Sequence, residues 1–268
     1  MNIPNLENAQ IRFFDSIYRH CVEKCRIENN AYSISMLKML NNGTAVLSDE
    51  TECDWYIAFY GGHHFYKLNA AFDSTNFRYT EGKDLEIIDW GCGQALATCV
   101  LIDYLIENSI KPNIVSITLI EPSSIALNRG CRFIQQMFQN YFSMNTTIRV
   151  VNKYIDDLNT SDLPSHTDTI KIHLFSNLID VEAFNIDGLY QLIVNSFKGL
   201  NRLICTSPDN YRLNRLDQFY NLFKESCDVR NSVQSDQEIY KEIFYFKTRK
   251  YERRRIGRCE RQFSVNLA

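Results

Sequence analysis

The spacing of apolar residues divides the chain into a helical first part and a second part in which strands and helices alternate. In the first part, apolar side chains recur every three or four positions, which is the period of an amphipathic helix. The clearest series is Ile11, Phe14, Ile17, Tyr18, Cys21 and Cys25. The helices predicted for this part are 5–28, 31–41 and 52–74, the last interrupted by Gly61-Gly62.

A polar loop over 76–83 separates the two parts, so we place a domain boundary between residues 82 and 83. Residues 1–82 are predicted to form a helical extension that covers the ligand pocket as a lid. Residues 83–268 are predicted to form the ligand-binding domain.

Beyond the loop, short apolar runs alternate with helical lengths of chain, and this order predicts right-handed crossovers and a parallel sheet. The predicted strands are 85–90, 115–120, 147–151, 170–176 and 201–206, and the predicted helices are 94–107, 123–139, 184–198 and 211–226. Two strand-like segments, 240–252 and 256–265, end the chain as a predicted hairpin. The expected fold class is α/β: a doubly wound, mostly parallel seven-stranded sheet with a C-terminal antiparallel hairpin and an N-terminal helical extension.

The composition is that of a globular protein that stays in solution. The 268 residues are 45% hydrophobic and carry a formal net charge of −3, and no apolar run is long enough to span a membrane. The first residues are polar and acidic, unlike a signal peptide. Nine cysteines, mostly inside apolar segments, predict reduced thiols in a cytoplasmic protein. Cys21 and Cys25 have no third ligand near them in sequence, so no metal site is expected.

Candidate chemistry begins at residues 85–95, which read Leu-Glu-Ile-Ile-Asp-Trp-Gly-Cys-Gly-Gln-Ala. An apolar strand ends in Asp89, a turn containing Gly91 and Gly93 follows, and a helix begins directly after it. Glycine lets a small ligand lie against bare backbone, and the free N–H groups of the helix start point at that ligand. The segment therefore predicts a site for a nucleoside-like cofactor.

The second candidate feature is the end of the next strand, at residues 117–123. The strand ends in Glu121, and Ser123 or Ser124 can cap the helix that follows. In doubly wound sheets, a carboxylate at this strand end accepts hydrogen bonds from ribose hydroxyls. A nicotinamide or flavin fingerprint would need a small residue at position 96, where this chain has Leu96.

Residues 86–95 and 117–123 together resemble the class I S-adenosylmethionine-dependent methyltransferases, and the resemblance covers about residues 84–268. It implies that Asp89 faces the methionine amino group and that Glu121 holds the ribose of S-adenosylmethionine. Tyr154 stands where the family often has an acidic residue near the adenine, with Asp156 or Asp157 slightly downstream, and Ala95 replaces a third glycine. The cofactor-binding residues expected on this basis are Asp89, Gly91, Cys92, Gly93, Gln94, Glu121, Pro122, Tyr154, Ile155 and Ser176.

Candidate catalytic residues come from two places in the chain. Ser176 and Asn177 end the fourth predicted strand, beside the first strand at the switch point where ligands bind. They border the transferable methyl group in this reading, or they only end the strand and cap the next turn. The segment 56–67 is rich in aromatic residues, and its His64 is our candidate general base. The alternative for this segment is a hinge between two core helices with ordinary packing aromatics.

Positive charge is concentrated over residues 247–261 of an otherwise acidic chain. With interleaved aromatic residues, this segment predicts a surface that follows phosphates, although charges on a terminal hairpin also protect a sheet edge. We therefore predict an S-adenosylmethionine-dependent methyltransferase, with RNA favoured over a small molecule or a protein as substrate. The alternatives are an inactive methyltransferase fold that serves as a binding or scaffold module and a nicotinamide oxidoreductase, against which Leu96 argues.

Overall fold

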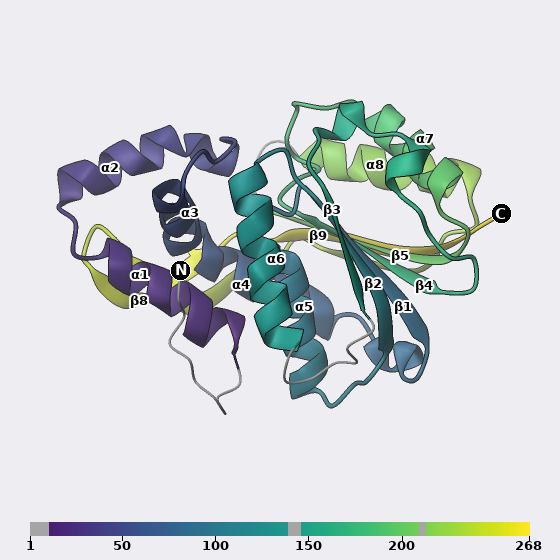
Figure 1. The fold of residues 1–268 in the computed structure, drawn as a ribbon, viewed down its shortest axis with the longest axis horizontal. Coiled ribbons are helices and arrows are strands. Elements are labelled where there is room, and N and C mark those ends of the chain that lie inside the picture. Colours follow the sequence, from purple (N-terminus) through teal and green to yellow (C-terminus); the bar gives the residue numbers. More distant parts are fainter. Residues whose placement is uncertain (1–10, 139–145, 209–212) are drawn as a thin grey trace.

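The computed structural model describes residues 11–138, 146–208 and 213–268. Figure 1 shows a twisted sheet with helices on both faces and, at one end, a group of N-terminal helices beside a small hairpin. Residues 5–10 of the first predicted helix lie outside the described residues. Within these ranges, no helix is both long enough and apolar enough to cross a lipid bilayer.

Seven strands form the main sheet in the order β3-β2-β1-β4-β5-β9-β6. Neighbours among the first five are parallel, whereas β9 is antiparallel to both β5 and β6. The strands are β1 (Asp84–Trp90), β2 (Asn113–Ile120), β3 (Thr147–Val151), β4 (Ile170–Ser176), β5 (Gly199–Ser207), β6 (Arg230–Ser235) and β9 (Cys259–Leu267). The predicted α/β fold class and its mostly parallel sheet are confirmed.

Helices cover both faces of this sheet. The helices α5 (Leu96–Glu107) and α6 (Ser124–Phe138) contact each other on one face, and α7 (Ile186–Ser196) and α8 (Leu213–Ser226) contact each other on the opposite face (Figure 1). This double cover explains why the central strands are buried almost throughout. The carboxyl ends of β1, β2 and β4 therefore meet at one edge of the sheet, next to the N-terminal helices.

The N-terminal part is helical, as predicted. Its elements are η1 (Phe13–Tyr18), α1 (Arg19–Cys25), α2 (Asn30–Met39), η2 (Asn41–Gly43), α3 (Glu50–Tyr56), η3 (Ile57–Gly61), α4 (Gly62–Asp73) and η4 (Phe77–Thr80). The predicted interruption at Gly61-Gly62 is wrong, because the π-helical turn η3 runs directly into α4. The glycines instead allow close packing of Tyr18, because a Cβ on Gly62 would lie 2.9 Å from its ring and hydroxyl.

The terminal hairpin lies earlier in the chain than predicted. It consists of β7 (Ile239–Tyr245) and β8 (Lys250–Ile256), so the predicted strand 240–252 contains its turn. The predicted second strand, 256–265, corresponds largely to β9, which joins the main sheet. The strand β6 was not predicted, because its residues Arg-Asn-Ser-Val-Gln-Ser are polar, as an exposed edge strand tolerates.

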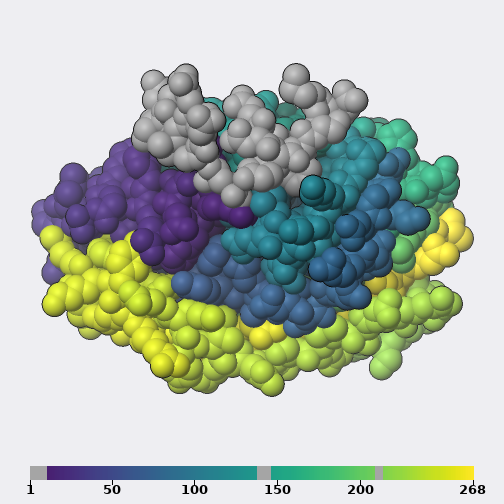
Figure 2. Space-filling model, turned by 90° about the horizontal axis from the view of Figure 1, so that it is seen from below, coloured from purple at the N-terminus to yellow at the C-terminus, as the bar shows by residue number. Residues whose placement is uncertain are grey.

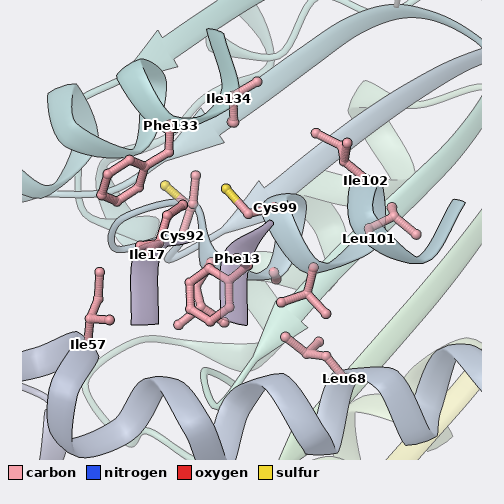
Figure 3. Close-up of a cluster of buried hydrophobic side chains, with 14 of the residues drawn as sticks. Phe13, Ile17, Ile57, Leu68, Cys92, Cys99, Leu101, Ile102, Phe133 and Ile134 are labelled. Carbon is pink, nitrogen blue, oxygen red and sulfur yellow. The ribbon is translucent and has the colours of Figure 1, made fainter. Parts of the chain in front are cut away.

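One hydrophobic core runs across the predicted boundary between residues 82 and 83. Figure 3 shows Phe13, Ile17 and Ile57 of the N-terminal part beside Cys92 and Cys99 of the sheet part. The hairpin also packs on the N-terminal helices, as Figure 2 shows from below. The Phe246 ring contacts Trp55 and Phe59 (centroids 5.2 and 4.5 Å apart), and the Phe244 N–H donates to the Tyr18 hydroxyl at 3.1 Å.

Candidate active site

The turn after β1 is shaped by backbone conformations that favour glycine. Gly91 and Gly93 have φ of +58° and +52°, and Ala95, the N-cap of α5, has φ of +56°. A Cβ on Gly91 would lie 2.7 Å from the Leu178 side chain, so this glycine allows close packing of the protein itself. A Cβ on Gly93 would meet no atom within 4 Å. The space in front of Gly93 is therefore open to a ligand.

Asp89 is buried at the end of β1, and only one of its two carboxylate oxygens accepts hydrogen bonds from the described residues. Its Oδ2 accepts hydrogen bonds from the backbone N–H of Thr98 at 3.1 Å and from the Thr98 hydroxyl at 2.7 Å. Its Oδ1 is buried without a hydrogen-bond partner among the described residues. Burial raises the pKa of Asp89 to about 7. A cationic donor placed at Oδ1 would satisfy this oxygen and restore the charged form.

Glu121 at the end of β2 reaches the glycine turn. Its Oε2 accepts from the backbone N–H of Gly93 at 3.0 Å, and its Oε1 accepts from that of Ser123 at 2.9 Å. Burial raises the pKa of Glu121 despite these two bonds. The structure thus joins the two segments that the sequence singled out separately. Asn152 holds the loop in place, because its amide donates to the carbonyls of Glu121 and Pro122 at 2.9 and 2.8 Å.

Gly130 of α6 packs closely against the turn, and no local sequence signal predicts this contact. A Cβ at this position would lie 2.6 Å from the carbonyl carbon of Gln94 and 2.8 Å from the Cβ of Ala95. The Gln94 side chain donates to the carbonyl of Cys53 at 2.9 Å, its Oε1 is buried with no partner among the described residues, and the residue lines the small cavity described below. The turn is therefore packed between α6 and α3.

A buried ion cluster fixes α3 against α6. The Arg129 guanidinium on α6 is inaccessible to solvent and forms ion pairs with Asp54 and, at 2.6 Å, with Glu50. Lys24 of α1 pairs with the same Asp54 carboxylate. Removing one charged side chain of such a cluster would leave a buried charge uncompensated. The wall that α3 forms over the turn is therefore firmly anchored at this end.

A small cavity of about 20 Å³ lies beside the turn. Its walls include Asp89, Gly91 and Ser176 on the sheet side and Tyr56 and His64 on the helical side. The Ser176 hydroxyl, like Asp89 Oδ1, is buried without a partner among the described residues. The enclosed space holds about one water molecule. A larger ligand at Asp89 requires the helical wall to move outward.

Asn177 connects β4 to the N-terminal helices. It has φ of +54° and its N–H donates to the carbonyl of Thr206 at 2.7 Å. Its Oδ1 accepts from the Lys67 ammonium, and its Nδ2 lies 2.6 Å from Nε2 of His64. Lys67 can only donate, so this amide orientation is fixed. Nε2 of His64 is then the acceptor, and the proton of the neutral ring is on Nδ1.

The two titratable groups of this network, His64 and Lys67, differ in charge at neutral pH. Burial, with a further contribution from Lys67, lowers the pKa of His64 well below its usual value. Burial also lowers the pKa of Lys67 to about 8, against the opposing effect of Asp180. At neutral pH His64 is uncharged and its Nε2 is occupied by Asn177. Lys67 is the group here whose proton can leave near physiological pH.

A second, much larger cavity of about 880 Å³ opens on the other side of this network. It lies between α2, the stretch from Tyr56 to Lys67, the loop after β4 and the β7–β8 hairpin. Tyr56 and His64 line both this cavity and the small cavity at the turn. The two spaces therefore share a wall two side chains wide.

The other predicted site residues differ in where they lie: Cys92 lines the small cavity at the turn, whereas Pro122, Tyr154 and Ile155 line neither cavity. The Cys92 thiol is buried, and the Cys92 N–H donates to the carbonyl of Ile120 at 2.9 Å. Tyr154 is 57% exposed, and neither it nor Ile155 lines either cavity. Their contact with an adenine, and that of Pro122 with a cofactor, stay predictions.

The basic segment 247–261 does not form one continuous positive surface. Arg258 is buried in an ion pair with Glu260, and Arg261 is buried in ion pairs with Asp217 and Asp236. These charges belong to the interior of the main sheet. The exposed cations are confined to the hairpin and its turn.

Comparison with known proteins gives likeness of fold only. No protein-family model matches the sequence, and no curated protein matches it. The plantazolicin methyltransferase BpumL, solved in complex with SAH, is similar over 94% of this chain and 100% of its own, with TM-score 0.48 and 10% identity. A SAM-dependent O-methyltransferase from Thermotoga maritima is similar over 87% of this chain and 71% of its own, with TM-score 0.43 and 10% identity. The small RNA methyltransferase HEN1 is similar over 75% of this chain and 25% of its own, with TM-score 0.45 and 11% identity.

The strand order and the antiparallel β9 define a doubly wound α/β sheet, and the similar structures named above are methyltransferases. The resemblance of residues 84–268 is confirmed at the level of the fold. The similar structures include enzymes described as acting on different kinds of molecule, so the substrate has to be argued from this chain's own residues.

Proposed function

We propose that this protein transfers the methyl group of S-adenosylmethionine to a substrate held in the 880 Å³ cavity. The observation that carries the proposal is the shared wall of Tyr56 and His64 between that cavity and the one at the glycine turn. With the helical wall moved outward and these two side chains displaced, a group bound along the turn would face a substrate on the other side.

The residues at the turn fit the cofactor chemically. The unpartnered Oδ1 of Asp89 and hydroxyl of Ser176 suit the ammonium of the methionine end, and the open space at Gly93 suits a ligand close to the backbone. Glu121, beside Gly93, is in position to accept from ribose hydroxyls through its remaining lone pairs. S-adenosylmethionine supplies, when bound, an electrophilic methyl group whose sulfur keeps the electron pair of the broken bond.

Lys67 is our candidate for the base, in place of His64. A substrate N–H or O–H that accepts the methyl group must lose a proton, and the neutral amine of Lys67 can take it because its pKa is about 8. Asn177 is a positioning residue, since its amide holds both Lys67 and His64. The pKa of His64 is too low, and its Nε2 too fully engaged, for the base role expected from the sequence.

A compact substrate suits this geometry better than the RNA favoured by the sequence. A cavity of 880 Å³ falls within the range of about 300–1,000 Å³ in which small molecules bind. Two of the eight basic residues that suggested RNA are buried in ion pairs. RNA stays a prediction, with the exposed cations of the hairpin as its support.

A matched pair of glycine variants tests cofactor binding. Gly93 and Gly82 both have positive φ (+52° and +66°), and a Cβ on either meets no protein atom within 4 Å. Gly93→Ala and Gly82→Ala should therefore lose a similar stability, about 1–2 kcal/mol. Only Gly93→Ala places its methyl where the cofactor would lie, so calorimetry should show about tenfold weaker S-adenosylmethionine binding for this variant alone.

Equal affinities in the two variants would contradict a site at the turn. Absence of binding to the parent protein, in a sample that unfolds cooperatively, would overturn the methyltransferase proposal. Binding of S-adenosylmethionine without turnover on any small-molecule or RNA extract would favour the second candidate, a methyltransferase fold that acts as a binding or scaffold module.

A further inference from the structure

The charges that line the large cavity are mostly positive. Lys67, Lys247, Arg254 and Arg255 contribute to its walls, and Asp180 is the one carboxylate among the lining residues that the structure describes. Asp180 is 8% exposed and accepts a hydrogen bond from the Ser207 hydroxyl at 2.9 Å. His63, also in the wall, is neutral at pH 7 because burial lowers its pKa to about 4.

Two of these cations are held in place by the hairpin. The Arg254 guanidinium lies 3.9 Å from the centroid of the Tyr245 ring and 3.7 Å from the Glu252 carboxylate. Arg255 pairs with Glu238 at 2.5 Å. Both arginines are on β8, and their side chains remain about half exposed. They are thus oriented by neighbours and still accessible to a ligand.

Most of the remaining cavity wall is apolar, with many aromatic rings. Ile34 and Leu37 of α2 line the cavity although they are 56% and 41% exposed, which is unusual for large aliphatic side chains gathered on one helix. Other parts of the wall are formed by aromatic rings from the helices and the hairpin: Tyr56, Phe59, Tyr60, Phe244, Tyr245 and Phe246. The Tyr60 hydroxyl is buried with no partner among the described residues.

We infer that the cavity binds a small anionic molecule with a flat apolar or aromatic body, its acid group near Arg254 and its rings between α2 and the hairpin. This inference specifies the substrate class of the proposed function. Only the description of the bound molecule as a substrate rests on that function, and the binding itself does not. Cations inside a cavity whose walls are aromatic select an organic acid, whereas a phosphate backbone is followed by cations on an open surface.

Two fluorescent probes of the same shape separate the charge from the body. Anilinonaphthalene sulfonate is anionic, and phenylnaphthylamine presents a similar aromatic body without the acid. We expect the full-length protein to bind one sulfonate probe per chain and to bind it more tightly than the neutral probe. Arg254→Gln should weaken the sulfonate probe by about tenfold and leave the neutral probe unchanged.

The control is Lys250→Gln, on the same hairpin, exposed, and absent from the cavity wall. It should change the binding of neither probe. A second variant, Leu37→Asp, alters an exposed position and should weaken both probes, the sulfonate more. Cooperative unfolding of each variant shows that binding is measured on a folded protein.

Equal binding of the two probes, or insensitivity of the sulfonate probe to Arg254→Gln and Leu37→Asp, would overturn the inference. Displacement of the probe by single-stranded RNA, with loss of that displacement in Lys250→Gln, would replace the small acid by RNA. Calorimetry with S-adenosylmethionine on the same samples keeps the two proposals apart. Cofactor binding without probe binding rejects only the substrate class, and the reverse rejects only the methyltransferase function.

Discussion

The glycine turn and the large cavity differ in how the chain forms them. The turn consists of consecutive residues 89–95, held by the strand end at Glu121 and by Gly130 behind it. The cavity takes its walls from α2, the helices over residues 56–67, the loop after β4 and the β7–β8 hairpin, segments that are in part more than two hundred residues apart. The proposed cofactor region thus depends mainly on backbone conformation, and the proposed substrate region on an arrangement of side chains.

This difference assigns different roles to substitutions on the two sides. A change at the turn should act on cofactor affinity, because it alters the backbone surface against which the ligand lies. A change in the network of Asn177, His64 and Lys67 should act on the rate, because that network lies between the two cavities.

Lys67→Met should produce the largest loss. Removing a general base costs about a hundredfold to ten-thousandfold in rate, and the rise of the rate with pH around 8 should disappear with it. Methionine is apolar and of similar length, so the buried site should still fold. Cofactor affinity, measured by calorimetry, should stay near that of the parent.

Lys247→Met is the control for Lys67→Met. It removes another positive charge from the wall of the same cavity, at an exposed position. If both variants lowered the rate alike and kept the pH profile, Lys67 would act only through its charge.

Asp89→Asn should weaken S-adenosylmethionine by about tenfold to a hundredfold, because a hydrogen bond to a charged group is lost. The asparagine amide can still accept from Thr98, so the start of α5 keeps its partner. Calorimetric titration measures the affinity directly. Affinity equal to that of the parent would remove Asp89 from the site.

The same variant should change how stability depends on pH. Burial raises the pKa of Asp89 from 3.8 to about 7, so the folded protein binds this proton more tightly than the unfolded chain does. The stability that Asp89 contributes is therefore full below about pH 4 and is lost as the pH rises through about 7. Without cofactor, the Tm of Asp89→Asn relative to that of the parent should therefore increase as the pH rises from 5 to 8. A pH-independent difference would contradict the raised pKa. Asp103, with a pKa also raised to about 7, is present in both proteins and cancels.

Gly130→Ala should have a smaller effect, on stability first and on cofactor binding second. Its Cβ would lie 2.6 Å from backbone of the turn, so α6 or the turn must shift, at a cost of about 1–3 kcal/mol. Gly188→Ala in α7 is the matched control, since its Cβ would meet nothing closer than 3.6 Å. That variant should be slightly more stable, by about 0.5–1 kcal/mol. Denaturant unfolding of the pair distinguishes close packing from helix propensity, and equal effects would argue against support of the turn by Gly130.

The smallest effect is expected for the double variant Lys250→Gln, Arg253→Gln. Both side chains are exposed on the hairpin and line neither cavity, so stability should change by less than about 0.5 kcal/mol. Methylation of a cavity substrate should be unchanged. A large, salt-dependent loss of RNA binding and of RNA methylation would restore the RNA prediction.

The sequence predicted the turn because its signals are local. Alternating apolar runs place strand ends, and the residues at those ends, Asp89 and Glu121, are adjacent in the structure as the topology requires. The fold class and five parallel strands followed from the same pattern. Segment 56–67 was selected for its aromatic density, and the structure places two of its members, Tyr56 and His64, on the wall between the cavities.

What the sequence could not supply depends on distant contacts. Gly130 looks like any helical glycine until the turn packs against it. The role proposed for Lys67 depends on the amide of Asn177, which follows β4 more than a hundred residues away. The basic segment appeared uniform because sequence does not distinguish an exposed hairpin strand from a buried sheet strand, and β8 and β9 divide it between the two.

The central claim is that the transferable methyl group reaches the large cavity between Tyr56 and His64. The most direct test is nuclear magnetic resonance of the protein with S-adenosylmethionine that carries an isotope-labelled methyl group. We predict nuclear Overhauser contacts from that methyl group to the Tyr56 ring, and their loss in Tyr56→Leu. A bound methyl group with contacts to neither Tyr56 nor His64 would contradict the claim.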